Sequence, residues 1–362
     1  MGILKPLKIF LTLLFFLSSG APGKDELPVL PPEARAPIDS LFDTPLSFGI
    51  DLVYQDRYQE ALTVFDSLQL EFPNHPAPYF YKAAVYQSWM SSFRFNHFHK
   101  ELEENIKIAI DKGNDLIKVR KNDPWLNFYL GAAYGYRAFF RYRKMNWIGA
   151  YMDGKKGVGN LKKALKKNPE LYDAYLGLGT YHYWRTARSK VLKVVAFWMK
   201  DKREFGIQQI DFSLRHGRYC LIESGFGLVA TLYDYKKYDE ALTALDSLSA
   251  NLKTPVISAI YLRARLMGYY GKWAEMRQIF EEILARLEEH PYESVGFKAE
   301  CKYWIAKTLQ EEMKLAEALV MAEEALALAP QRDKDKELEG PLESFKEIHK
   351  RTVALHSDLQ KK

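Results

Sequence analysis

The stretch Asn168–Arg185 reads NPELYDAYLGLGTYHYWR, and it decides the fold. Pro169 marks the end of one helix and the start of the next, because proline is tolerated in the first turn of a helix and not in its interior. The following helix carries glycines on both sides of Leu178 and then an aromatic run. Small residues in the middle of a helix let a second helix pack closely against it. We therefore interpret this stretch as one helix of a tightly packed pair.

These positions resemble the first helix of a tetratricopeptide repeat (TPR). The TPR pattern is W-x2-L-G-x2-Y, then A-x3-F, then P, over about 34 residues. Tyr175 stands at the W position, Leu178 and Gly179 at L-G, and His182 at the Y position. The helix and the basic insertion after it are similar to exported bacterial TPR proteins of undefined role. The resemblance implies an all-α, right-handed α-solenoid with a scaffolding or adaptor task, and no catalysis or cofactor.

The same pattern recurs along the chain, which predicts about seven helix pairs over residues 42–330. In the first pair Ala61 precedes Phe65 by four residues, and Pro73 ends the second helix. A small alanine lets two antiparallel helices touch, and the phenylalanine fills the space between them. Corresponding residues in the later pairs are Ala241 and Leu245, then Phe280, then Ala318, Ala325 and Pro330.

Residues 1–20 are predicted to be a secretory signal peptide. Lys5 and Lys8 form a basic start, and Ile9 to Leu17 is an apolar core too short to span a bilayer comfortably. Cleavage between Gly20 and Gly23 would place the mature protein outside the cytoplasm, in the periplasm or as a secreted protein.

Two further segments flank the predicted solenoid. Residues 21–41 contain five prolines and are predicted to be an extended linker. Residues 331–362 are predicted to be a charged linker followed by a capping helix, because Leu342–Leu359 is amphipathic and a solenoid needs a polar-faced end.

The composition excludes several kinds of protein. Of 362 residues, 48% are apolar, as in ordinary folded proteins, and 14% are aromatic, which is high. Two cysteines exclude a disulfide scaffold and a cysteine-based zinc site. We interpret Cys220 and Cys301 as small buried apolar residues.

Pairs two to four are longer than the repeat pattern. The Y position and the small residue of the second helix lie nine residues apart in the pattern, but 23 apart between Tyr134 and Gly157. Pairs two and four show similar excesses. An insertion shared by both helices adds about two turns to each. We predict three lengthened hairpins whose tips project from one edge; disordered loops are the alternative, disfavoured because the insertions are rich in aromatic residues.

The three insertions, residues 87–100, 137–156 and 185–203, carry fifteen Lys or Arg and two Asp, a net charge of +13 against +6 for the chain. This segregation predicts a basic, aromatic rim that meets an anionic membrane or cell-wall polymer. The alternative is that the rings pack tip against tip and the charges keep that edge soluble. We do not expect nucleic acid as a partner, because of the export signal. The predicted rim residues are Arg137, Arg141, Arg143, Lys144, Arg185, Arg188, Lys200, Lys202 and Arg203.

The second candidate surface is the concave groove. The TPR resemblance implies that groove residues come from set positions of the first helix in each pair, and many of these are aromatic here. An aromatic groove suits an extended peptide or a partner helix. The alternative is that tight winding fills the groove with the same rings. The predicted groove residues are Trp125, Phe128, Tyr136, Tyr183, Trp184, Phe226, Tyr233, Tyr261 and Tyr269.

Three enzyme-like patterns are weak. Gly149–Lys156 nearly fits a phosphate-binding loop, but Lys156 replaces the hydroxyl residue that holds magnesium. His97 and His99 would diverge on a helix, so they do not predict a metal site. His182 has no identifiable partner carboxylate or nucleophile, which favours a hydrogen-bonded structural role. We predict no enzyme activity, no metal and no cofactor.

The sequence thus favours an exported, non-enzymatic scaffold that binds protein or peptide segments in its groove. The alternative is a peripheral envelope protein whose basic rim docks on membrane or cell-wall polymer, with a role in outer-membrane assembly.

Overall fold

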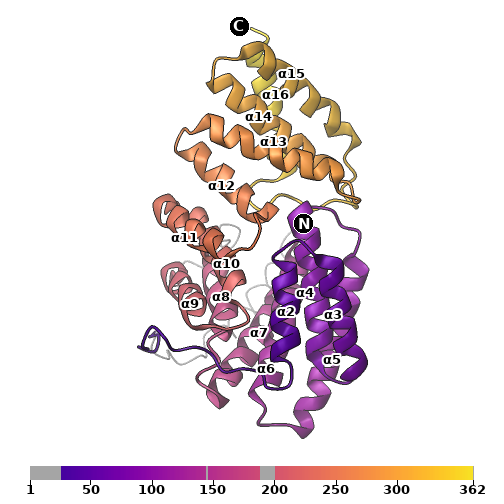
Figure 1. Ribbon diagram of the computed structural model, residues 1–362, viewed down its shortest axis with the longest axis vertical. Coiled ribbons are helices and arrows are strands. Elements are labelled where there is room, and N and C mark those ends of the chain that lie inside the picture. Colours follow the sequence, from indigo (N-terminus) through magenta and orange to yellow (C-terminus); the bar gives the residue numbers. More distant parts are fainter. Residues whose placement is uncertain (1–25, 144–145, 188–199, 362) are drawn as a thin grey trace, which may run out of the picture. The chain divides into compact units, whose positions relative to one another are not determined.

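The computed structural model describes residues 26–143, 146–187 and 200–361. The chain divides into Met1–Pro31 and Pro32–Lys362, and the second unit contains all the helices discussed below (Figure 1). The predicted signal peptide lies outside the described residues. The helices are α2 (Asp43–Val53), α3 (Tyr58–Glu71), α4 (Pro76–Phe93), α5 (His99–Val119), α6 (Pro124–Arg143), α7 (Trp147–Lys167), α8 (Ala174–Ala187), α9 (Arg203–His216), α10 (Leu221–Asp234), α11 (Tyr238–Asn251), α12 (Ile257–Tyr269), α13 (Trp273–Glu289), α14 (Val295–Glu311), α15 (Leu315–Leu328) and α16 (Phe345–Leu359).

Consecutive helices pack as pairs, as the sequence predicts. Each even-numbered helix from α2 to α14 packs on the helix that follows it, and each pair packs on the next. The helix α16 packs on α14 and α15 and covers the end of the last pair, which confirms the capping helix. The described residues contain no strand, although an isolated antiparallel bridge joins Phe95 to Glu337. The unit is an all-α solenoid.

The turn inside a pair has one recurring geometry wherever the pair carries no insertion. One residue adopts a left-handed backbone, with φ between 57° and 68°. The N–H of the next residue then donates to the carbonyl five residues earlier, which satisfies the end of the first helix. The left-handed residues are Asp56, Lys236, Gly271 and Met313, and the bonds are Arg57 to Leu52, Lys237 to Leu232, Lys272 to Met267 and Lys314 to Leu309.

The glycines of the repeat pattern mark the closest approaches between paired helices. A Cβ added at Gly179 in α8 would lie 2.6 Å from the carbonyl oxygen of Gly206 in α9, and one added at Gly206 would lie 2.7 Å from the oxygen of Gly179. In the first pair a Cβ at Gly49 would meet the ring of Phe65 at 2.4 Å. These positions therefore require glycine because the neighbouring helix occupies the space.

The lengthened hairpins are confirmed in pairs two and three. The helices α4 and α5 have 18 and 21 residues and α6 and α7 have 20 and 21, whereas α3 has 14. In pair four, α8 and α9 have 14 residues each, and residues 188–199 of the insertion lie outside the described part of the chain. Within the described residues, no helix has both the length and the apolar character to cross a membrane.

Candidate functional site

The chain's own N-terminal residues 34–56 contact the first helices α6 and α10 and the segment that joins α9 to α10. Ala36 N donates to the carbonyl of His216 at the end of α9 (2.7 Å). Further along, the guanidinium of Arg218 donates to both carboxylate oxygens of Asp43 (2.8 and 2.9 Å). At the end of α2, Tyr54 Oη donates to Glu223 in α10 (2.6 Å). The first pair is thereby tied directly to the fourth and fifth pairs.

Buried polar contacts fix this segment in place. Asp39 accepts a hydrogen bond from Tyr129 Oη (2.6 Å), and its backbone N–H donates to Tyr219 Oη (2.8 Å). Asp173 accepts from three consecutive backbone N–H groups, those of Arg218, Tyr219 and Cys220, at the start of α10. Burial raises the pKa of both Asp39 and Asp173. These carboxyl groups are parts of the packing between pairs, and hydrogen bonds satisfy them.

Most of the predicted groove rings contact other parts of the same chain. Trp125 lies 5.7 Å from the ring of Tyr219, Tyr136 lies 5.2 Å from Phe80, and Phe226 stacks 6.1 Å from Tyr54. The buried members are Phe128, Tyr183 and Tyr261; the half-buried ones are Trp125, Tyr136, Trp184, Phe226 and Tyr233. Tyr269 is different, since 59% of it is exposed.

Tyr269 belongs to a row of rings that we call the tyrosine ridge, made of Tyr233, Tyr238 and Tyr269. The ring centroids of Tyr233 and Tyr238 are 5.2 Å apart, and those of Tyr238 and Tyr269 are 4.0 Å apart. The ridge joins the first helices α10 and α12 through the start of α11. Sequence reasoning found Tyr233 and Tyr269 and missed Tyr238. The signal for it was the aromatic residue after a basic one that opens the second helix in three pairs, at Tyr58, Tyr238 and Trp273.

The tip of the second pair does not project, which corrects our prediction for the first insertion. Arg94, with φ +58°, is 4% exposed, and its guanidinium pairs with Glu300 in α14 (2.5 Å). It lies over the rings of Phe297 (3.6 Å) and Tyr261 (4.6 Å). Figure 1 shows this tip beside the segment that leads to α16, where Asn96 N donates to the carbonyl of Lys336.

The tip of the second pair also contacts His290, which follows α13. Trp89 Nε1 donates to His290 Nε2 (3.1 Å), and the ring of Phe93 stacks on His290 at 3.8 Å. The other ring nitrogen lies 3.0 Å from the carbonyl oxygen of Tyr292. Burial lowers the pKa of His290. Because the Trp89 N–H can only donate, Nε2 of the neutral ring accepts and Nδ1 carries the proton toward the Tyr292 carbonyl, while the backbone N of Tyr292 also lies 3.2 Å from Nδ1.

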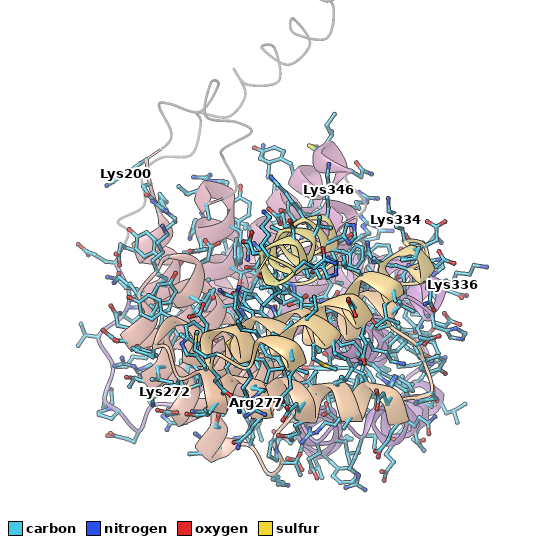
Figure 2. All side chains as sticks on the ribbon, turned by 90° about the horizontal axis from the view of Figure 1, so that it is seen from above. Lys200, Lys272, Arg277, Lys334, Lys336 and Lys346 are labelled. Atoms are coloured by element: carbon cyan, nitrogen blue, oxygen red, sulfur yellow. The ribbon has the colours of Figure 1, made fainter. Side chains whose placement is uncertain are left out.

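The described rim residues are largely engaged within the molecule. Arg137 and Arg141 both pair with Asp153 (2.8 and 2.7 Å), which is 1% exposed. Arg203 pairs with Asp201 (2.6 Å), Arg185 lies over Tyr181 and Lys202 over Phe205. Lys200 is exposed. Figure 2 places Lys200 at one margin of the molecule and Lys334 and Lys336 at the opposite one, so the labelled cations do not converge. Lys144, Arg188 and the side chain of Arg143 lie outside the described part.

The residues of the three enzyme-like patterns lie in a helix or contact neighbouring side chains. Gly149–Lys156 lies within α7, where a helical backbone replaces a phosphate-binding loop. His182 Nδ1 lies 2.6 Å from Gln209 Oε1, and burial lowers the pKa of His182. The ring of His97 lies 4.7 Å from the ring of Tyr292. Among the described residues, no group of three or more His, Cys, Asp or Glu side chains could hold a metal ion.

Comparison with known proteins gives a likeness of fold. The sequence matches no protein-family model and no curated protein. A chain of the APC/C hetero-tetramer Cut9–Hcn1 superposes with a TM-score of 0.55 at 12% identity, over 89% of this chain and 51% of that one. A thermophilic TPR protein of Thermus thermophilus gives 0.39 at 18% identity, over 62% and 96%. Yeast Tom70 gives 0.41 at 14% identity, over 93% and 67%.

This chain thus spans about half of the Cut9–Hcn1 chain that it matches, and at that identity the likeness shows the fold alone. The repeat pattern, the seven helix pairs and the capping helix agree with it. The chain therefore has the fold of a tetratricopeptide-repeat solenoid, right-handed and all-α.

Proposed function

We propose that the chain is a non-catalytic scaffold that binds a protein segment, and that the segment binds on the tyrosine ridge. The observation that carries the proposal is the exposed ring of Tyr269, which lies in a row of contacting rings with Tyr238 and Tyr233. Tyrosine combines a large apolar face with a polar tip, and it loses little side-chain entropy when a partner covers it. Tyrosines are accordingly enriched among the residues that dominate binding energy.

The ridge is favoured over the rest of the groove because the other rings already have partners. Tyr54 stacks on Phe226 of α10, Asp39 accepts a hydrogen bond from Tyr129 of α6, and Tyr219 lies against Trp125, so a second segment could reach these rings only by displacing parts of the chain itself. A segment that binds at Tyr269 displaces nothing. Its affinity therefore carries no cost for breaking the hydrogen bonds of Asp39, Asp43 and Tyr54.

The test uses the full chain and a library of random peptides displayed on phage. Peptides selected on the immobilised chain should lose about thirtyfold in affinity when Tyr269→Ala or Tyr233→Ala is introduced, because truncating a central aromatic residue costs about 2 kcal/mol or more. The matched control is Val353→Ala, which removes a comparably exposed apolar side chain from α16. Selected peptides that bind all of these variants as tightly as the original chain would refute the proposal.

The second candidate function is docking of the basic rim on a membrane or cell-wall polymer. It is supported by the exposure of Lys200 and by the excess of basic residues in the insertions. Charge reversal at Arg141, Arg143, Lys200 and Lys202 should abolish association with isolated envelopes and leave peptide binding intact. Envelope association that survives these four changes would exclude the rim.

We also propose that the protein works outside the cytoplasm, on the strength of the basic start and apolar core of residues 1–20. N-terminal sequencing of the chain recovered from the extracytoplasmic fraction should give a first residue between Ala21 and Lys24. A chain that stays in the cytoplasm with residues 1–20 attached would contradict export.

A further inference from the structure

The outward face of α7 is more basic than that of any other second helix described here. Its side toward α6 is apolar, with Leu161 and Ala164 buried, which fixes the orientation of the helix. The opposite side carries six exposed lysines: Lys155, Lys156, Lys162, Lys163, Lys166 and Lys167. By contrast, α11 and α15 contain acidic residues and no Lys or Arg. The positive face is therefore a local property of the third pair.

These lysines are not neutralised by neighbours. Asp153 is the one acidic residue of α7, and it is buried between Arg137 and Arg141. No ion pair with an acidic side chain is formed by any of the six lysines within the described part of the chain. Lys156 lies over the ring of Tyr134 and Lys167 donates to the carbonyl of Lys121, but neither contact cancels a charge. Six like charges over about three turns therefore attract an anionic surface.

The start of α7 adds an apolar component. Ile148 is 65% exposed and Met152 is 43% exposed. They stand one turn apart, and the same stripe continues through Lys155, Lys162 and Lys166 at helical spacing. A soluble polyanion would contact the lysines and leave Ile148 and Met152 in water. A bilayer accommodates both parts, since its headgroups meet lysines and its outer hydrocarbon takes the apolar side chains.

We propose that the outward face of α7 docks on a lipid surface rich in anionic headgroups, with Ile148 and Met152 entering the interface. This proposal does not rest on the scaffold function. The residues of the α7 face and of the tyrosine ridge are different, so either proposal can fail without the other. It also differs from docking of the basic rim, because four of its lysines, Lys162, Lys163, Lys166 and Lys167, lie outside the three insertions.

The test is vesicle flotation with the full chain. Vesicles of phosphatidylcholine alone are compared with vesicles that also contain phosphatidylglycerol. We expect binding to the mixed vesicles, weakening as salt is added. Lys162→Glu with Lys166→Glu should lower the partition coefficient by at least about tenfold, because each basic residue near an anionic surface contributes about fivefold. All variants begin at the same residue, so any contribution of the N-terminal residues is common to them.

Two matched variants make the test specific. Lys107→Glu with Lys118→Glu makes the same charge change at exposed positions of α5 and should change partitioning by less than about twofold. Ile148→Ser with Met152→Ser keeps every charge and should still weaken binding to the mixed vesicles. Equal losses from the α5 and α7 changes would show that only net charge matters and would overturn the proposal. An unaffected Ile148→Ser, Met152→Ser variant would assign the face to a soluble polyanion instead. Unchanged thermal unfolding confirms that these exposed substitutions leave the fold intact.

Discussion

Two lengthened hairpins of this molecule have similar compositions and opposite surroundings. Both the α4–α5 pair and the α6–α7 pair exceed the repeat length, and both tips are aromatic and basic. The first tip is buried against α13, α14 and the segment before α16, with Arg94 paired to Glu300. The second keeps its arginines on Asp153 of its own hairpin, with Ile148 exposed.

The location of the acidic partner decides whether a basic tip is buried or stays at the surface. Arg94 meets an acid that lies 206 residues later in the sequence, whereas Arg137 meets one 16 residues later. A nearby acid lets a tip satisfy its own charge and stay at the surface. A distant acid can pair only if the solenoid brings the second pair next to the seventh, so this ion pair is also a tertiary contact.

The largest effect should follow from removing Arg94. Arg94→Ala leaves Glu300, whose side chain is 4% exposed, without its guanidinium partner and exposes the faces of Phe297 and Tyr261. We expect the free energy of unfolding to fall by about 3–5 kcal/mol, as for other buried ion pairs that lose one partner. Denaturant unfolding followed by circular dichroism measures this change.

The double variant Arg94→Met, Glu300→Leu tests whether the loss comes from an unpaired buried charge. It removes both charges and fills the site with apolar side chains, so much of the lost stability should return. A loss below about 1 kcal/mol for Arg94→Ala would mean that the tip is not held by this contact, and the distinction between the two hairpins would fail.

A smaller loss of unfolding free energy is expected at the tip of the α6–α7 pair. Asp153→Asn removes the charge shared by Arg137 and Arg141, whose side chains are 25% and 36% exposed. Because water can solvate the two guanidinium groups, the cost should be about 1 kcal/mol. The same unfolding measurement checks it, with Asp211→Asn as a control at another ion-paired site, in α9. A loss of unfolding free energy equal to that of Arg94→Ala would contradict the proposed difference between the two hairpins.

The sequence predicted local structure well because the repeat pattern is local. The Ala61–Phe65 spacing and the glycine of α8 set contacts between consecutive helices, and those contacts formed as predicted. It could not predict the contacts of Arg94 with Glu300 or of Tyr54 with Glu223, which join pairs far apart in the chain. These depend on how the superhelix turns, a sum of small angles between pairs that no single position encodes.

For the candidate surfaces as well, the sequence predicted which residues take a given repeat position and could not predict their exposure. Position within the repeat identified Tyr233 and Tyr269, but it could not distinguish the exposed Tyr269 from the buried Tyr183. Both stand near the ends of first helices, and their exposure is set by neighbours. Tyr183 packs on Tyr235 and hydrogen-bonds to Asp234, two residues of the following pair.

The smallest expected effect is a dependence of stability on pH at the tip of the α4–α5 pair, which contacts His290. The pKa of His290 is lowered by burial, so the unfolded chain binds a proton at this residue more readily than the folded chain does. The stabilising contribution of neutral His290 is therefore complete above the ordinary histidine pKa of about 6.5, and it is lost progressively as the pH falls below that value. The imidazolium form would direct an N–H at Trp89 Nε1, which is itself a donor.

His290→Gln should therefore flatten the decline of unfolding free energy between neutral and mildly acidic pH, because an amide oxygen can accept from Trp89 and does not titrate there. His349→Gln is the control, since His349 stacks on Phe345 at 6.0 Å, away from the first tip. If both variants keep the slope of the original chain, His290 does not contribute to the acid sensitivity. If only His290→Gln flattens it, the buried tip weakens on acidification through a residue that the exposed tip lacks.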